Sequence, residues 1–174
     1  IACFTLVWFL NPANAIDIKE VVSPGGIRAW LVENHNIPLI AMNFSFEGGT
    51  TSDPAGKEGA VNFITGMMDE GAADLDSAAF QARRDELAVR IMFDAGGDQF
   101  EGAIQTLSKN RREAFALHRK ALTTPHFEKE AMERVRQQFL LGAKDDEQDP
   151  EKIASRAWMK LALGDQLYAR HGAG

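Results

Sequence analysis

Short apolar runs bounded by turn residues dominate the first third of the chain, and this pattern is typical of β-strands. Three such runs follow one another: 18–22, 27–33 and 37–46. Pro24-Gly25-Gly26 separates the first two, and Asn34-His35-Asn36 separates the second from the third, so both connections have good turn chemistry. The pattern predicts three strands that open the domain as an antiparallel meander.

Farther along, two more strands are expected at 91–93 and 99–106, around Gly96-Gly97. Elsewhere the apolar residues recur with the helical period. The expected helices span 57–70, 76–88, 110–122, 127–146 and 151–168. Asp76 is suited to cap the second helix, and Pro150 to begin the last. Strands followed by helices predict an α+β domain, with an antiparallel or mixed sheet and helices packed on one face.

The helix expected at 57–70 has an apolar stripe through Ala60, Ile64 and Met67. Asn62 and Gly66 lie one turn apart on another face. Two residues at this i, i+4 spacing can offer two imidazoles to one zinc ion, with a glutamate immediately before the second histidine as general base. This chain has Asn62, Thr65 and Gly66 at those three positions. The spacing of a zinc motif is therefore present without its ligands.

The surroundings of this helix resemble the pitrilysin/insulinase family of zinc peptidases, whose motif is His-x-x-Glu-His. The resemblance is carried by Phe46–Thr50, Asp53–Gly56, Gly59–Met67, Glu70–Ala72, Leu122–Phe127 and Asp149-Pro150. These segments extend over most of the chain. The family's subunits consist of two α/β halves in tandem, and the resemblance implies that residues 16–174 cover most of the first half.

In the catalytic members that this chain resembles, a glutamate from a later helix is the third zinc ligand, and the family spacing places it at Gly142. Position 142 also continues an apolar stripe with the helical period. That stripe consists of Ala131, Val135, Phe139 and Gly142. We therefore expect position 142 to point inward. A catalytic zinc needs three protein ligands and a base for its bound water, and all four positions carry residues that cannot serve.

The resemblance therefore implies a non-catalytic subunit that pairs with a catalytic insulinase-type chain and completes its peptide-degrading chamber. No cofactor is expected in this chain, and zinc is expected in the partner. Resembling non-catalytic subunits contribute an arginine and a tyrosine from their second half. In relatives, the strand matching Ile91, Met92, Phe93 and Asp94 is an exposed edge to which a peptide adds as an extra strand.

Two other functions stay open at this point. The chain could be a peptide-binding or structural scaffold module that has no peptidase partner. It could also be an active zinc peptidase whose motif lies elsewhere in the sequence than at Asn62, Thr65 and Gly66. Recovery of the protein with or without a His-x-x-Glu-His chain separates the first two functions.

The composition argues against nucleic acid as a partner. The net charge is -6 and the isoelectric point about 5.2, and the longest basic runs are pairs such as Arg83-Arg84. The four histidines show no i, i+3 or i, i+4 pair, so we expect them to be surface or packing residues. The methionines and phenylalanines at helix and strand spacings are expected in the core, rather than on a peptide-contact surface. They are Phe63, Met67, Met68, Phe80, Phe93 and Phe100.

The first fifteen residues predict a signal peptide that is truncated at its start. Ile1 to Leu10 is an apolar run, and Ala13-Asn14-Ala15 fits the small-x-small rule for cleavage after Ala15. The run is shorter than the roughly 20 residues of a membrane span. Cys3 lies within this segment, so the mature chain would have no cysteine. The periplasm of a Gram-negative bacterium is the expected location, and the alternative is a buried N-terminal strand.

Overall fold

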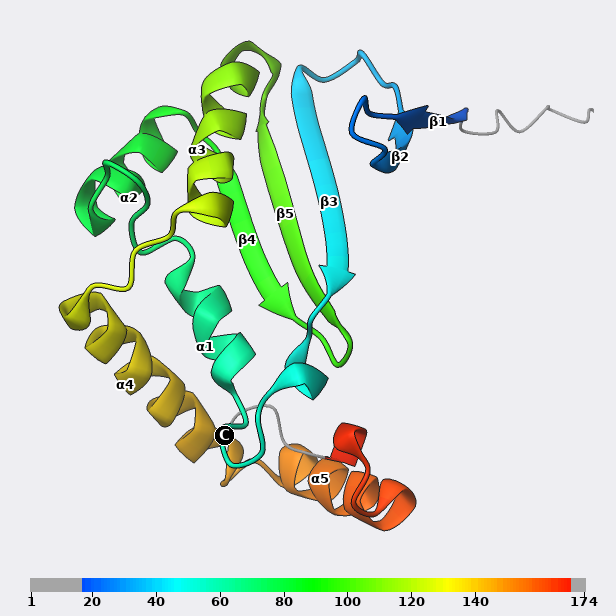
Figure 1. Cartoon of the computed structure of the whole chain (residues 1–174), viewed down its shortest axis with the longest axis vertical. Coiled ribbons are helices and arrows are strands. Elements are labelled where there is room, and N and C mark those ends of the chain that lie inside the picture. Colours follow the sequence, from blue (N-terminus) through cyan, green and yellow to red (C-terminus); the bar gives the residue numbers. More distant parts are fainter. Residues whose placement is uncertain (1–16, 170–174) are drawn as a thin grey trace, which may run out of the picture. The chain divides into compact units, whose positions relative to one another are not determined.

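The computed structural model describes residues 17–169, which fall into two compact units that divide between Ile37 and Pro38. In the first unit, β1 (Ile18–Val22) and β2 (Arg28–Val32) form an antiparallel hairpin (Figure 1). The backbone carbonyl of Ser23 closes its turn by accepting from the amide of Gly26 at 2.9 Å. The predicted signal peptide, residues 1–15 with Cys3, lies outside the described residues.

The second unit has a three-stranded antiparallel sheet of β3 (Leu39–Glu47), β4 (Arg90–Ala95) and β5 (Gln99–Leu107). The strand order is β3-β5-β4, so β5 is central and β4 lies at an edge. The predicted opening meander is wrong, because β3 pairs with β5 along its whole length instead of with β2. The predicted α+β class is confirmed.

Five α-helices follow the expected order in the described part of the chain. They are α1 (Ala60–Met67), α2 (Ser77–Glu86), α3 (Arg111–Thr123), α4 (Lys129–Asp146) and α5 (Pro150–Leu163). The Asp76 side chain accepts from the amide of Ala79 at 2.8 Å, and Pro150 begins α5, as predicted. No helix between residues 17 and 169 is both long and apolar enough to cross a membrane.

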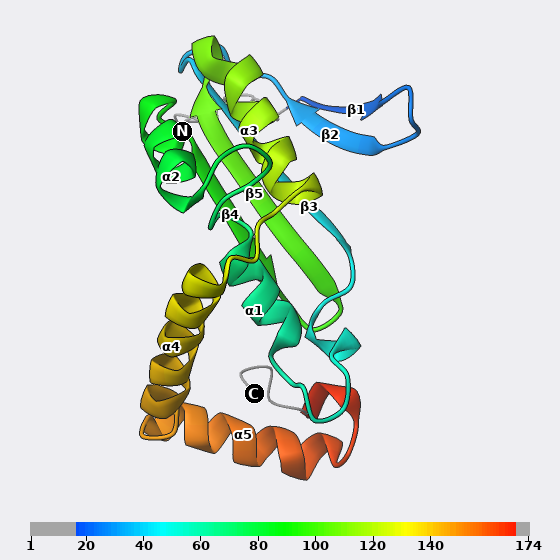
Figure 2. The same ribbon diagram turned by 60° about the vertical axis from the view of Figure 1, so that its left-hand side comes forward.

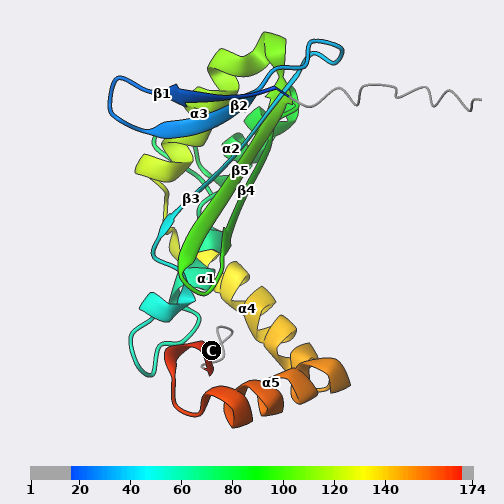
Figure 3. The same ribbon diagram turned by 90° about the vertical axis from the view of Figure 1, so that its right-hand side faces the viewer.

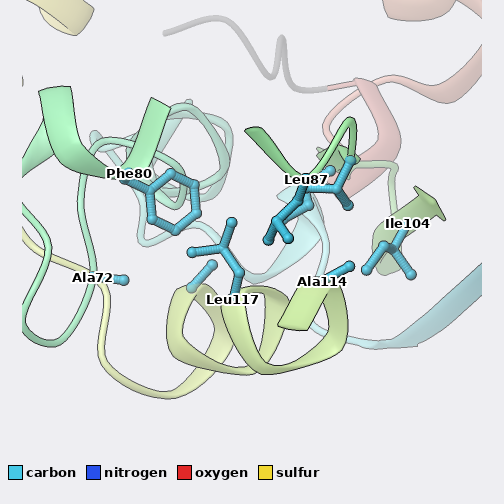
Figure 4. Close-up of a cluster of buried hydrophobic side chains, with 9 residues drawn as sticks. Ala72, Phe80, Leu87, Ile104, Ala114 and Leu117 are labelled. Carbon is cyan, nitrogen blue, oxygen red and sulfur yellow. The ribbon is translucent and has the colours of Figure 1, made fainter. Parts of the chain in front are cut away.

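Helices α2 and α3 pack against one face of the sheet, as predicted, and the main core lies between these helices and the sheet (Figure 4). Phe80 of α2 and Leu117 of α3 point toward each other there, and Ile104 of β5 lines the same core. Phe80 and Phe100 are buried as predicted, and so are Met67 and Met68. Phe63 and Phe93 are partly buried and pack against apolar clusters.

Helix α4 runs away from the sheet, and α5 then continues in a crosswise direction from its end (Figure 2). The short 3-10 helix η3 (Leu167–Ala169) then brings the chain to the β4–β5 turn, where the Tyr168 hydroxyl donates to a carboxylate oxygen of Asp98 at 2.7 Å. At its other end α4 packs against α1, which in turn contacts β4 (Figure 3). Helix α1 therefore lies between the edge strand and α4.

Candidate functional site

Helix α1 begins at Ala60, three residues later than predicted, because the preceding loop is fixed by Asp53. The buried Asp53 carboxylate accepts from the amides of Gly59 at 2.7 Å and Val61 at 2.8 Å. Gly59 has φ of +95°, a left-handed conformation that suits glycine and breaks the helix at this point. The loop that begins at Asp53 thus caps the start of α1 at the candidate site.

The face of α1 that meets α4 differs from the predicted apolar stripe. Ile64 is exposed, whereas Phe63 and Met67 join Ala131 and Val135 of α4 in a small apolar cluster. The ring of Phe63 meets that of Phe139 edge-on, with 6.1 Å between their centroids. We call this contact between α1 and α4 the seam.

Gly66 lies in the seam directly against Phe139. A Cβ atom added at Gly66 would lie 2.8 Å from Cε2 of Phe139 and 3.2 Å from Cγ1 of Val135. The first distance is shorter than real Cβ contacts, so a side chain at position 66 needs the aromatic ring to move. The space into which a metal-binding imidazole would extend is therefore filled by Phe139.

The other motif positions do not supply zinc ligands either. The Thr65 hydroxyl donates to the backbone carbonyl of Asn62 at 2.7 Å, so it is directed to its own helix. Within the described range, residues 17–169, no three His, Cys, Asp or Glu side chains gather closely enough to hold a metal ion. Neutral side chains at Asn62 and Thr65, and none at Gly66, do not fit the donor set that zinc requires.

Gly142 does not point inward as the stripe predicted. The residue is exposed, and a Cβ atom added there would have no neighbour within 4 Å. The physical reason is that α4 meets α1 at Ala131, Val135 and Phe139, whereas position 142 faces open space. The prediction of an inward-facing position 142 is therefore wrong, although the residue still offers no ligand.

The two carboxylates at the end of α1 are engaged with cations. Asp69 pairs with Arg84 at 2.6 Å, and Glu70 pairs with Arg134 of α4 and accepts from the Ser77 hydroxyl at 2.7 Å. Burial raises the pKa of Asp69 above its usual value, and the nearby Arg84 only partly opposes this. Both acids therefore stabilise the fold around α1, and the Glu70–Arg134 pair also joins α1 to α4.

The predicted peptide-binding segment is placed at an edge of the sheet. Ile91, Met92, Phe93 and Asp94 lie on β4, which pairs with β5 on one side. Ile91 is buried and Phe93 partly buried toward the helices, whereas Met92 and Asp94 are exposed on the opposite face. The edge strand is thus anchored through alternate side chains, which leaves its other face to solvent.

His118 of α3 lies beneath this strand, at a place that the sequence did not indicate. Its ring stacks on Phe93 at 5.7 Å between centroids and meets Phe44 edge-on at 5.4 Å. The side chain is buried and its Nε2 atom has no hydrogen-bond partner. Burial lowers the pKa of His118 below its ordinary value, so the neutral ring is favoured. Its predicted role as a packing histidine is confirmed.

The β4–β5 turn is held from two directions. The amides of Thr50 and Thr51 donate to the carbonyls of Gly96 and Gly97, each at 2.8 Å. The Thr51 hydroxyl donates to one oxygen of the Asp98 carboxylate at 3.1 Å, and the hydrogen bond from Tyr168 ends on the other oxygen. The end of the edge strand is therefore fixed to the loop before α1 and to the end of the α5 region.

Known proteins resemble this chain both in sequence and in fold. Over 157 residues, 90% of the chain, the sequence is 24% identical to the non-peptidase homolog YmxG of Helicobacter pylori. The fold matches the crystal structure of an inactive domain of peptidase M16 from Pseudomonas fluorescens with a TM-score of 0.81 and 25% identity, over 91% of the chain. The chain is similar to inactive, insulinase-like (M16) proteins. The resemblance predicted from the sequence is thereby confirmed.

No family model matches the chain. The chain spans 35% of the length of the Helicobacter protein and 39% of that of the Pseudomonas chain. Both relatives are described as lacking peptidase function, one as a non-peptidase homolog and the other as an inactive domain. The likeness is therefore to a non-peptidase homolog and to an inactive M16 domain, over little more than a third of each chain.

Proposed function

We propose that this chain is a non-catalytic M16 subunit that pairs with a separate, zinc-bearing insulinase-type chain in the periplasm and helps to form a peptide-degrading chamber. Its contribution would be to complete the chamber wall and to hold peptide. The zinc and the general base would belong to the partner. The observation that carries the proposal is the seam, where a helix that resembles the family's zinc helix has no metal ligand at Asn62, Thr65 or Gly66.

The loss of metal chemistry is compatible with a retained frame. Asp53 still caps α1 with two short hydrogen bonds, and Asp69 and Glu70 still fix its end through Arg84 and Arg134. A helix that served only as a metal carrier would have no reason to keep this support once the ligands were gone. Retention of the frame supports a structural role for α1 beside the edge strand.

Peptide holding through β4 needs no metal. An extended peptide that adds to a sheet edge is bound by main-chain hydrogen bonds, and alternate side chains supply selectivity. Ile91 and Phe93 anchor β4 from below, so its backbone is pre-organised for such pairing. We propose that peptides lie along this edge next to α1, with Met92 and Asp94 on the exposed face beside them.

Affinity purification of the full reading frame from its native host tests the pairing. The proposal expects a His-x-x-Glu-His chain in near-equal amount, with zinc and chelator-sensitive peptide hydrolysis in the complex but not in this subunit alone. A stable complex that contains no such chain would contradict the proposal and support a scaffold module instead. Stoichiometric zinc in the subunit alone would contradict both.

Export is tested separately, since the pairing does not depend on it. We propose cleavage after Ala15, on the basis of the apolar run and the Ala13-Asn14-Ala15 segment. Fractionation of the host followed by N-terminal sequencing should find the protein in the periplasm with Ile16 as its first residue. An uncleaved protein that remains in the cytoplasm would contradict this part.

A further inference from the structure

The two glycines at former metal positions have opposite surroundings. Gly66 lies against Phe139, so that even a methyl group would come within 2.8 Å of the ring. Gly142, on the same helix as Phe139, has open space where its side chain would be. The absence of a side chain is therefore required by packing at position 66, and packing does not require it at position 142.

We infer that Phe139 has taken over the place of the metal in this chain: its ring, seated on Gly66, joins α1 to α4 and closes the seam against zinc. In the catalytic members that the chain resembles, ligands from these two helices meet on one ion. Here the two helices meet where the ring of Phe139 packs against Gly66, which has no side chain. The inference concerns this chain alone and does not depend on the proposed partner.

The neighbours of Phe139 support this assignment. Phe63 meets the ring edge-on from α1, and Val135 lies against Gly66 together with Phe139. The Glu70–Arg134 ion pair joins the same two helices nearby. Apart from the ion pair the contacts are apolar, so an added zinc ion would have to displace the ring from a surface that offers it no ligand.

A comparison of Gly66→Ala with Gly142→Ala tests the packing role. In a helix, glycine to alanine normally stabilises, and Gly142→Ala should raise the thermal unfolding midpoint of the purified chain by about 2–4 °C. Gly66→Ala should lower the midpoint instead, because the methyl group displaces Phe139. In the Phe139→Ala background, or the milder Phe139→Leu background, the loss caused by Gly66→Ala should disappear, while the effect of Gly142→Ala stays unchanged.

An increase in the midpoint for Gly66→Ala with Phe139 intact would overturn the inference. So would a decrease of the same size in all three backgrounds, because the two residues would then be uncoupled. These results differ from a failure of the proposed function, since a chain with a coupled seam could still purify without a peptidase partner.

Exclusion of zinc has its own measurement. The double substitution Asn62→His with Gly66→His creates a two-histidine helical site, whose zinc affinity can be measured by titration calorimetry with and without Phe139→Ala. We expect at least a tenfold tighter affinity when Phe139 is removed, equivalent to about 1.4 kcal/mol. Equal zinc affinity with and without Phe139 would show that the ring does not exclude zinc from the site.

Discussion

The edge strand β4 and the seam between α1 and α4 lie next to each other but differ in the kind of group on which each depends. In β4 the feature that matters is the backbone, which is held at the sheet edge by Ile91 and Phe93. In the catalytic members that the chain resembles, the corresponding helices carry the side chains that bind zinc. In this chain Gly66 and Phe139 pack against each other in the seam instead.

Under the proposed function, peptide holding and metal chemistry are separable in this fold. A strand edge binds through groups that every residue has, so substitutions change its selectivity more readily than they remove it. A zinc site depends on a few side chains, and their replacement removes the chemistry at once. The edge strand can thus persist in a chain whose motif positions carry no zinc ligand.

The largest effect is expected from Ile91→Ala, which removes the buried anchor of the edge strand. Truncation of a buried isoleucine costs about 2–5 kcal/mol of unfolding free energy, and Ile91 is only 4% exposed. Met92→Ala, on the exposed face of the same strand, should cost less than about 0.5 kcal/mol. Urea unfolding of both variants measures the contrast, and equal losses would show that β4 is not anchored through its inner face.

Asp53→Ala should cost about 2 kcal/mol, because two amides at the start of α1 lose a buried acceptor. Asp76→Ala is the matched control at the exposed start of α2, where about 1 kcal/mol is expected. The measurement is again urea unfolding, with hydrogen exchange at the amides of Gly59 and Val61. If those amides stay protected in Asp53→Ala, another group caps α1.

A smaller and pH-dependent effect is expected from His118. Its folded-state pKa is lowered by burial, so below pH 6.5 the unfolded chain binds a proton that the folded chain resists. His118 should therefore add no pH dependence above pH 6.5, and stability should fall as the pH drops from 6.5 through the folded-state pKa. His118→Phe should remove this component from unfolding curves taken between pH 5 and 8. An unchanged profile in His118→Phe would assign the dependence to other groups.

The smallest effect is expected from Tyr168→Phe, which removes the hydroxyl that donates to Asp98. The contact is exposed, so its loss should cost no more than about 1 kcal/mol. Hydrogen exchange at the end of η3 should quicken, while exchange in β4 should stay the same, since Thr50 and Thr51 still hold the turn. Faster exchange throughout β4 would show that the edge strand depends on the α5 region.

Local sequence signals predicted the helices and the hairpin β1–β2 well, because caps and turns act within a few residues. Strand pairing was less accessible. Nothing between residues 37 and 46 indicates that β3 pairs with a strand about 60 residues away, and the turn at Asn34-His35-Asn36 favoured the wrong neighbour. The hydrophobic pattern fixes which face of a strand is buried but leaves its partner open.

In the candidate site, the missing ligands at Asn62, Thr65 and Gly66 could be read from the sequence, whereas the packing that replaced them could not. Helical spacing grouped Gly142 with Phe139, yet only the crossing of α1 and α4 determines where that stripe leaves the seam. A glycine at position 66 indicates that another residue can approach the helix backbone closely there. Which residue approaches is a property of the tertiary fold.

Metal content of the chain, purified alone and dialysed at neutral pH, tests the central claim most directly. The account predicts no stoichiometric zinc by elemental analysis, even after incubation with an excess of the ion, and no chelator-sensitive peptide hydrolysis. One zinc ion retained per chain through dialysis would contradict it, because residues without ligand groups and a seam filled by Phe139 could not hold the ion.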